Sequence, residues 1–446
     1  MHQIRTGFLI GLVAVLLSLP AFGQELRRSG FFGVVTAELA TADLAKLPTG
    51  TTGILVRDLV EGGSAKAAGL QAGDVVTKVN GKAVQGVDDF VQTVRRLRAG
   101  DKAEVVLFRS GQELTRTITV RPKPLESAPD VTTEYRAVEV DGTLRRVIVT
   151  EPKTPGVHPA VLFVTGIGCF SQESADLSAS DAQLLYGLTR AGFVTMRVEK
   201  SGMGDSQGTP CSDPAVDLSA ERRGYVAGLR ALKGYSFVDA SNVFVVGISI
   251  GGVQAPLIAQ EVPVKGIVVI NTIIKPFLEY LLETRRLQNT LARVPFDEID
   301  RRARLNESCN HKLLIDRLSF DEVIRAKPEC RDFITYPQPY TYMQQWASID
   351  LASEWKKVSA PVLIVYGTSD YVSSIADDPS MAQVLNSFHP GTATLKEIKD
   401  MDHPMYKASS MEESMNWPAG KPREFQAAIL PAINEWLTSQ IGRPVH

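Results

Sequence analysis

Short apolar runs, many of them β-branched, follow one another from residue 30 to residue 121, with glycine and aspartate between them. Such runs predict strands at residues 31–37, 53–60, 74–79, 103–109 and 114–120. Apolar residues at helical spacing over residues 87–97 predict one amphipathic helix within the same segment. We therefore expect a small β-rich domain over residues 30–122.

The pattern changes after a polar stretch that contains Pro122, Pro124 and Pro129. Because these prolines lie in a segment without periodicity, they predict an extended linker over residues 123–131. A hairpin is expected next, with strands at residues 133–140 and 143–150 joined by Asp141-Gly142.

From there on, apolar strands alternate with amphipathic helices. The strands are expected at residues 160–165, 193–198, 243–246, 266–270, 361–366 and 394–398, and the helices at 181–191, 217–232, 253–260 and 425–440. This alternation predicts an α/β fold with a doubly wound, mainly parallel sheet over residues 132–442. A helical stretch at about residues 272–357 interrupts it and predicts a cap over the site.

Residues 1–23 have the layout of a secretory signal peptide. A short basic region with His2 and Arg5 precedes an apolar run over residues 8–19, and small residues at Ala21 and Gly23 predict cleavage before Gln24. The alternative is an uncleaved anchor helix, but the apolar run is short for spanning a bilayer, which takes about 20 residues. We expect an exported protein, periplasmic or extracellular, with no stable membrane span after cleavage.

Composition narrows the class of partner. The 446 residues include 48 basic and 50 acidic side chains, for a formal net charge of −2, and 44% are hydrophobic. That balance excludes a disordered chain and argues against nucleic acid as a partner. No metal-ligand cluster, phosphate loop or dinucleotide fingerprint is present in the sequence, so we expect no metal and no cofactor.

A nucleophile is predicted where the strand at residues 243–246 runs into Gly247-Ile248-Ser249-Ile250-Gly251. The Gly-x-Ser-x-Gly pattern places a serine on a tight turn between a strand and a helix, where larger neighbours would clash. A serine in this position needs a base and an acid that follow it in the order acid, then histidine.

Asp370 and His403 meet that requirement. Each lies just past a predicted strand, and the carboxyl ends of parallel strands form the edge where open α/β sheets place their sites. None of the other five histidines follows a strand at this edge. The rival acids Asp377, Asp378 and Asp402 are each displaced from a strand end.

Acyl transfer also needs hydrogen-bond donors for the oxyanion. One is expected from the backbone of Ile250, which follows the nucleophile. The second is expected from the loop after the strand at residues 160–165, with Ile167 first and Gly168 next.

Two families resemble parts of this chain. GGSAKAAGLQAGDVV at residues 62–76, followed by VNGK at 79–82, resembles the core of a PDZ domain, in the style of bacterial envelope proteases. The resemblance implies a C-terminal peptide ligand, whose carboxylate would meet Phe31, Phe32, Gly33 and Val34. The alternative is that these residues are only core aromatics and a turn.

The second resemblance covers residues 131–441. FVTGIG at residues 163–168 and KSGMGDSQG at 200–208, with the nucleophile turn, resemble the serine aminopeptidase-like and esterase branch of the α/β-hydrolase superfamily. The sequence differs from the family pattern at two positions: Thr165 replaces a histidine that is common there, and Ser201 replaces an arginine. These differences weaken any assignment of the family's substrate class to this chain.

Four cysteines in an exported chain are disulfide candidates. Cys169 and Cys211 both lie near the predicted site, and Cys309 and Cys330 both lie in the predicted cap. We expect the pairs 169–211 and 309–330; the other two pairings would tie the core to the cap.

These observations favour a serine hydrolase that forms an acyl-enzyme on Ser249, most simply a carboxylic ester hydrolase acting on a small-molecule ester. A serine peptidase whose PDZ-like domain selects peptide substrates is the first alternative. A non-catalytic envelope binding protein on a hydrolase scaffold is the second.

Overall fold

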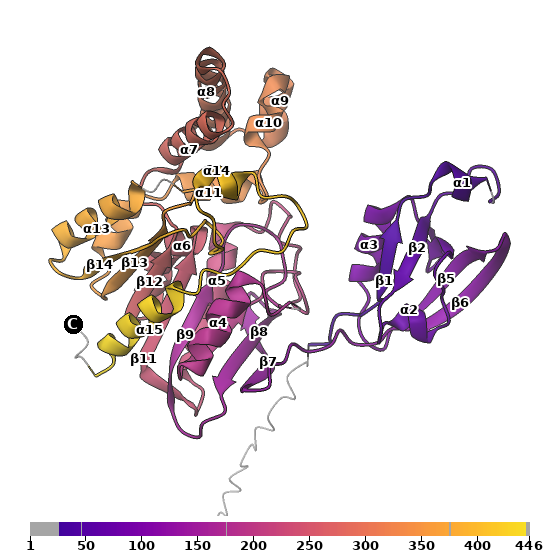
Figure 1. Cartoon of the computed structure of the whole chain (residues 1–446), viewed down its shortest axis with the longest axis horizontal. Coiled ribbons are helices and arrows are strands. Elements are labelled where there is room, and N and C mark those ends of the chain that lie inside the picture. The colour runs from indigo at the N-terminus through magenta and orange to yellow at the C-terminus, as the bar shows by residue number, and fades with distance from the viewer. Residues whose placement is uncertain (1–25, 46, 175, 374–375, 443–446) are drawn as a thin grey trace, which may run out of the picture.

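The computed structural model describes residues 26–45, 47–174, 176–373 and 376–442. The predicted signal peptide lies outside the described residues. Two sheets organise the chain, and Figure 1 shows the smaller sheet standing apart from the larger one, joined to it by a narrow connection.

The first sheet is antiparallel, with strands in the order β1-β2-β3-β5-β6 and β4 paired to β3. Its strands are β1 (Val34–Ala37), β2 (Ile54–Leu59), β3 (Val75–Val79), β4 (Lys82–Ala83), β5 (Lys102–Arg109) and β6 (Gln112–Thr119). Three helices accompany it, α1 (Thr41–Leu44), α2 (Ser64–Ala67) and α3 (Val87–Arg95). The alternating apolar positions of the strands meet the apolar face of α3, with the Phe90 ring edge-on to Phe32 at 5.6 Å, and form one core.

The second sheet has eight strands in the order β14-β13-β12-β11-β9-β10-β8-β7. They are β7 (Val131–Val140), β8 (Thr143–Pro152), β9 (His158–Val164), β10 (Val194–Val198), β11 (Val238–Ile248), β12 (Gly266–Ile270), β13 (Val362–Gly367) and β14 (Ala393–Ile398). The hairpin β7–β8 is antiparallel, β8 is antiparallel to β10, and the remaining pairs are parallel. The sheet is therefore mainly parallel, as expected from the alternating pattern.

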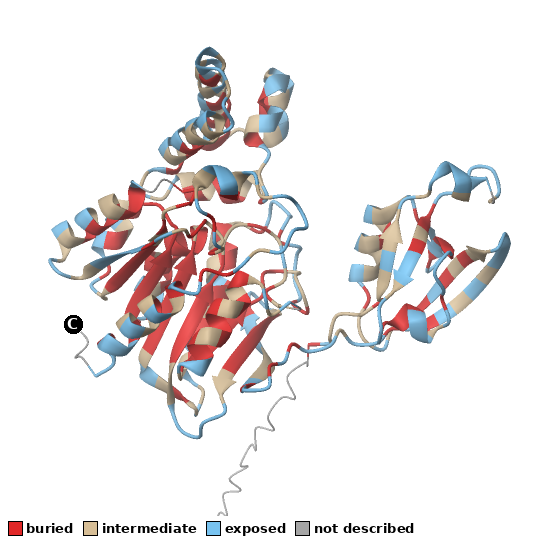
Figure 2. Ribbon diagram, in the orientation of Figure 1, coloured by how far each residue is buried: buried red, intermediate tan, exposed pale blue. Residues whose placement is uncertain are grey.

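Helices cover both faces of this sheet, so its inner strands are buried along most of their length, whereas the edge strands β7 and β14 are mostly half-buried or exposed (Figure 2). One face packs on α4 (Ser180–Arg190) and α15 (Ile429–Gln440). The other packs on α5 (Leu218–Lys233), α6 (Ile250–Glu261), α12 (Leu351–Lys356) and α13 (Asp377–Phe388). The result is the doubly wound α/β-hydrolase architecture.

The helical cap lies between β12 and β13. It contains α7 (Phe277–Leu291), α8 (Phe296–Asn310), a π-helical turn (His311–Ile315), α9 (Phe320–Ala326), a 3-10 turn (Pro328–Cys330), α10 (Arg331–Ile334) and α11 (Tyr340–Ala347). In Figure 1 the cap helices rise above the edge of the sheet, with α7 and α8 side by side. Within the cap, a disulfide joins Cys309 to Cys330. Outside the cap, a short helix α14 (Met411–Met415) follows the last strand, β14.

Candidate active site

Ser249 sits on the turn between β11 and α6, in a backbone conformation that few residues adopt (φ 54°, ψ −123°). The flanking glycines make this turn possible. A Cβ on Gly247 would lie 2.4 Å from the carbonyl oxygen of Gly251, and a Cβ on Gly251 would lie 2.0 Å from that of Val164. The Gly-x-Ser-x-Gly pattern is thus required by close backbone contacts, which present the serine above the end of β11.

Asp370 and His403 meet at the carboxyl edge of the sheet, on the loops after β13 and β14. The His403 Nδ1 atom lies 2.8 Å from Asp370 Oδ2. The Asp370 carboxylate is buried and also accepts bonds from the backbone N–H of Val372 (2.7 Å) and Ser373 (3.1 Å) and from the Ser373 hydroxyl. These bonds fix the carboxylate in place beside the imidazole.

Burial and charge act in opposite directions on His403. Burial alone lowers the pKa of the imidazole, but the charge of Asp370 and its bond to Nδ1 more than reverse that effect, with a smaller contribution from Asp402. The net pKa of His403 lies above its usual value of 6.5. The His403 imidazole therefore stays protonated up to a higher pH than an isolated histidine.

The three rival acids lie in other surroundings. Asp402 accepts from the Tyr406 N–H (2.7 Å), the Ser414 hydroxyl (2.8 Å) and the Arg423 guanidinium. Asp377 pairs with Lys275 at 3.1 Å. Asp378 is buried, and burial raises the pKa of its carboxyl well above the usual range, with Asp370 and Asp377 adding to the effect. Of the four carboxylates, Asp370 is the one bonded to the His403 ring.

Ser249 and His403 line the same small cavity, of about 10 Å³, which is room for about one water molecule. Its other walls come from α6, the end of β12, the cap and the Asp370 loop: Ile250, Val253, Asn271, Thr272, Ile273, Tyr280, Trp346 and Ser373. Trp346 stacks on Phe277 with ring centroids 3.9 Å apart. Two cap aromatics, Tyr280 and Trp346, therefore form part of the wall around the serine.

The loop that is expected to supply an oxyanion donor lies against Ser249. A Cβ on Gly166 would stand 3.7 Å from the Ser249 Cβ, so this backbone passes directly beside the serine. Gly168 has φ 123°, which favours glycine, and a Cβ there would stand 3.0 Å from the ring of Phe170. The Cys169–Cys211 disulfide ties this loop to the loop after β10.

Charged residues at the end of β10 form hydrogen bonds with the backbone of this loop. Arg197 Nη1 donates to the carbonyl oxygen of Gln172 at 2.9 Å, and Glu199 accepts from the Gln172 N–H at 2.9 Å. Lys200 Nζ donates to the carbonyl oxygen of Gly166 at 3.0 Å. The sequence did not identify Arg197, Glu199 or Lys200 as site residues. The feature that could have identified them is their position at the end of a buried strand, on the edge of the sheet that carries the site.

Asn271 was also missed. It follows β12 at the same edge and, with φ 48°, turns its amide toward the histidine loop. Its Nδ2 donates to the carbonyl oxygens of Asp402 (3.0 Å) and His403 (2.8 Å), while its Oδ1 accepts from the Gly367 N–H (2.9 Å). Asn271 thus connects the end of β13, which precedes Asp370, to the loop that carries His403.

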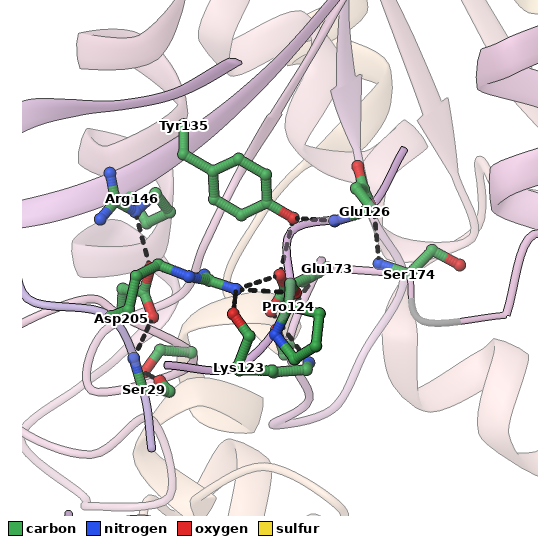
Figure 3. Close-up of polar contacts among 12 residues, drawn as sticks. Ser29, Lys123, Pro124, Glu126, Tyr135, Arg146, Glu173, Ser174 and Asp205 are labelled. Carbon is green, nitrogen blue, oxygen red and sulfur yellow. Dashed lines mark hydrogen bonds and ion pairs between the residues drawn. The ribbon is translucent and has the colours of Figure 1, made fainter. Parts of the chain in front are cut away.

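A buried polar cluster joins the smaller sheet to the loops of the larger one (Figure 3). Asp205 accepts from the Ser29 N–H (2.7 Å), Arg28 Nη1 (2.7 Å) and Arg146 Nε (3.0 Å). Glu173 pairs with Arg28 at 2.6 Å and Lys123 at 2.9 Å. The two chain segments that enter and leave the smaller sheet are therefore fixed to the loops after β9 and β10.

The segment expected as a linker takes part in the same cluster. Glu126 is buried and pairs with Arg197, and its Oε2 accepts from the Ser174 N–H at 2.7 Å. Arg28 Nη2 donates to the carbonyl oxygens of Lys123 (2.9 Å) and Pro124 (3.1 Å). The stretch has no regular secondary structure, but its first residues, 123–126, are held by these charged side chains.

The smaller unit has a groove of about 190 Å³ between β1 and α3. Phe32, Gly33 and Val34 lie at its end, while Phe31 does not line it. Gly33 has φ 72°, and a Cβ there would stand 2.6 Å from the Cα of Gly63, so this position needs glycine. The remaining walls are apolar, apart from Arg95 and Thr36: Gly30, Phe90, Val91 and Val94.

Within the described residues, no group of three or more histidine, cysteine, aspartate or glutamate side chains is arranged to hold a metal ion. In that same part of the chain, no helix is both long and apolar enough to cross a membrane.

The fold and site define a PDZ domain followed by an α/β-hydrolase domain. Residues 30–120 match the PDZ domain family, and residues 170–407, more than half of the chain, match the serine aminopeptidase S33 family. The chain belongs to the serine aminopeptidase S33 family.

Individual relatives match one part of the chain or the other. Esterase EstD of Thermotoga maritima is 26% identical over 240 residues, which cover 53% of this chain and 52% of the esterase. A probable periplasmic serine endoprotease DegP-like of Pseudomonas savastanoi pv. phaseolicola is 36% identical over 110 residues, which cover 24% of this chain and 22% of the protease. The chain thus spans about half the length of the first relative and about a fifth of the second.

Among solved structures, Est1E from Butyrivibrio proteoclasticus with bound ferulic acid aligns to 69% of this chain and 100% of its own. The TM-score is 0.45 and the sequence identity 17%.

Proposed function

We propose that this chain is an exported serine hydrolase that cleaves carboxylic esters through an acyl-enzyme on Ser249. The observation that supports it most is the shared cavity of Ser249 and His403, together with the 2.8 Å contact from His403 to Asp370. The esterase among the relatives supports esters as substrates.

The proposed reaction has two steps. With Nδ1 protonated and bonded to Asp370, Nε2 of His403 takes the Ser249 hydroxyl proton as the serine oxygen bonds to the ester carbonyl carbon. The bond to the alcohol breaks, and His403 gives the proton to the leaving oxygen. A water molecule then attacks the acyl-enzyme, His403 takes its proton, and the carboxylic acid leaves as the proton returns to Ser249.

In this proposal the oxyanion that forms in each step is bound by the backbone N–H groups of Ile250 and Ile167. Ile250 begins α6, whose N-terminus favours negative charge. Gly168 is the next candidate on the loop. Cofactors and metals have no part in this chemistry.

Export is supported by the two disulfides, by the predicted signal peptide and by the periplasmic relatives of the PDZ domain. The groove between β1 and α3 is proposed to take a C-terminal peptide, with its carboxylate at the Phe32-Gly33 backbone. Screening the full chain against a library of C-terminal peptides tests this role; a library without a binder would refute it.

Peptidase activity is the second candidate, because the PDZ domain is similar to those of endoproteases and could deliver chain ends. A panel of p-nitrophenyl esters against aminoacyl p-nitroanilides separates the two. We expect turnover of esters by the wild type and none by Ser249→Ala; turnover of amides alone would favour the peptidase.

A further inference from the structure

Lys200 is a buried cation directly behind the candidate oxyanion loop. Its side chain is 1% exposed, and its Nζ lies 3.0 Å from the Gly166 carbonyl oxygen and 3.2 Å from a carboxylate oxygen of Glu221. The same ammonium lies 5.5 Å from the ring centroid of Phe170, farther along the loop. A lysine is costly to bury, so its position requires such partners.

Glu221 is itself held in place by the core and the cap. Its Oε1 accepts from Gln254 Nε2 at 2.9 Å and from the Tyr342 hydroxyl at 3.3 Å. Gln254 lies on α6 behind Ser249, and Tyr342 lies on α11, the cap helix that also carries Trp346. The Lys200–Glu221 pair is therefore fixed by α6 and α11, two of the elements that form the walls around Ser249.

The contact with Gly166 has a consequence for Ile167. In a trans peptide unit the C=O of one residue and the N–H of the next lie in one plane and point in opposite directions. Holding the Gly166 carbonyl therefore also sets the direction of the Ile167 N–H. A cation on that carbonyl further polarises the unit and makes the N–H a stronger donor, as in other chains of hydrogen bonds.

We propose that Lys200 is a positioning residue for the oxyanion hole, which orients and polarises the Gly166–Ile167 peptide so that its N–H binds the developing oxyanion. The role rests on the proposed function, since it needs an acyl transfer at Ser249. Lys200 itself touches neither substrate nor reacting atoms. Its effect is expected on the transition state and not on substrate binding.

Lys200→Met is the direct test. Removing one oxyanion donor typically lowers kcat by about 10² to 10³, and a misdirected donor should lower it by about 10- to 100-fold, with KM for a p-nitrophenyl ester changed less than about threefold. Lys200→Arg, which keeps a cationic donor, should recover part of the loss. Lys233→Met is the matched control, because Lys233 Nζ donates to the Pro263 carbonyl at 2.5 Å, away from the site.

Because Lys200→Met removes the ion pair of the buried Glu221 carboxylate, the variant could fail to fold. The double variant Lys200→Met/Glu221→Gln removes both buried charges and is measured beside it, with near-ultraviolet circular dichroism to check folding. Amide hydrogen exchange over residues 165–172 adds a readout that needs no activity. Exchange should become faster in the folded Lys200 variants and stay unchanged in Lys233→Met.

The outcomes are distinct. A folded Lys200→Met, or the folded double variant, with wild-type kcat and wild-type loop exchange would overturn the inference. The inference would also be overturned if Lys200→Arg lowered kcat as much as Lys200→Met while hydrogen exchange of the loop stayed unchanged. If wild type neither turns over esters nor reacts with a fluorophosphonate, the proposed function fails instead, and hydrogen exchange alone then decides whether Lys200 holds the loop.

Discussion

His403 Nδ1 lies 2.8 Å from Asp370 Oδ2, and the contact joins two loops that leave neighbouring parallel strands. Burial lowers the pKa of the imidazole, but the charge of this aspartate, its bond to Nδ1 and the charge of Asp402 together raise that pKa above 6.5. Because the proposed base must be neutral to take the serine proton, the pKa of His403 sets the acidic limb of the activity profile.

The first prediction concerns that limb. Activity of the wild type should fall as the pH drops through a midpoint above 6.5, the ordinary histidine value. Asp370→Asn removes the charge that raises the pKa, so the midpoint should move to lower pH while kcat falls by about 10³- to 10⁴-fold. A pH series of kcat/KM measures both effects. Asp400→Asn on the histidine loop is the control, and an equal shift there would contradict the account.

The second prediction concerns the nucleophile turn. Gly251→Ala places a Cβ 2.0 Å from the Val164 carbonyl oxygen, so the backbone must move, at a cost of about 3 kcal/mol or more. The temperature of thermal unfolding and the rate of ester turnover should both fall. Gly224→Ala on α5 is the control, because its Cβ would meet only Val198 at 3.9 Å. The control should be neutral or slightly more stable; equal losses in both variants would refute the steric argument.

The third prediction concerns the size of the acyl group. The cavity of about 10 Å³ beside Ser249 leaves little space beneath Trp346, so acetyl esters should be preferred over butyryl esters by about tenfold or more. Trp346→Leu should reduce that preference by opening the cavity. Trp355→Leu removes another buried tryptophan on α12, outside the cavity, and should lower stability without changing the ratio. A wild type that hydrolyses octanoyl esters as fast as acetyl esters would contradict this reasoning.

The fourth prediction concerns the junction between the two domains. Arg28→Met removes the bonds to Asp205, Glu173 and the chain leaving the PDZ domain, and should weaken the attachment by about 3 kcal/mol. Small-angle X-ray scattering should then report a larger radius of gyration. Arg27→Met is the control, since Arg27 is exposed and pairs with Asp101 inside the PDZ domain. A scattering profile of Arg28→Met identical to wild type would show that other contacts hold the junction.

Strand order and the edge rule predict Ser249, Asp370 and His403 at one edge of the sheet; His403 contacts Asp370 and lines one cavity with Ser249, while their catalytic roles stay a prediction. Each directly follows or lies near the end of a buried strand, so one local pattern predicts each position. The sheet followed from alternating strands and helices, and the PDZ core from a long local motif. The cysteine pairs 169–211 and 309–330 are present as expected.

The contacts that the sequence could not predict join residues that lie far apart in the chain. Asn271 acts on residues 131 and 132 positions away, and the Glu126–Arg197 pair joins residues 71 apart, so no local period marks them. Likewise, nothing in the sequence separates Trp346, which lines the cavity, from the other aromatic residues of the cap. Such contacts are set by tertiary packing.

Mass spectrometry of the full chain after reaction with a fluorophosphonate probe tests most directly whether Ser249 is the nucleophile. We expect a single adduct on the peptide that contains Ser249, absent in Ser249→Ala, whose ester turnover is lost as well. An adduct on another residue, or undiminished ester turnover by Ser249→Ala, would show that Ser249 is not the nucleophile.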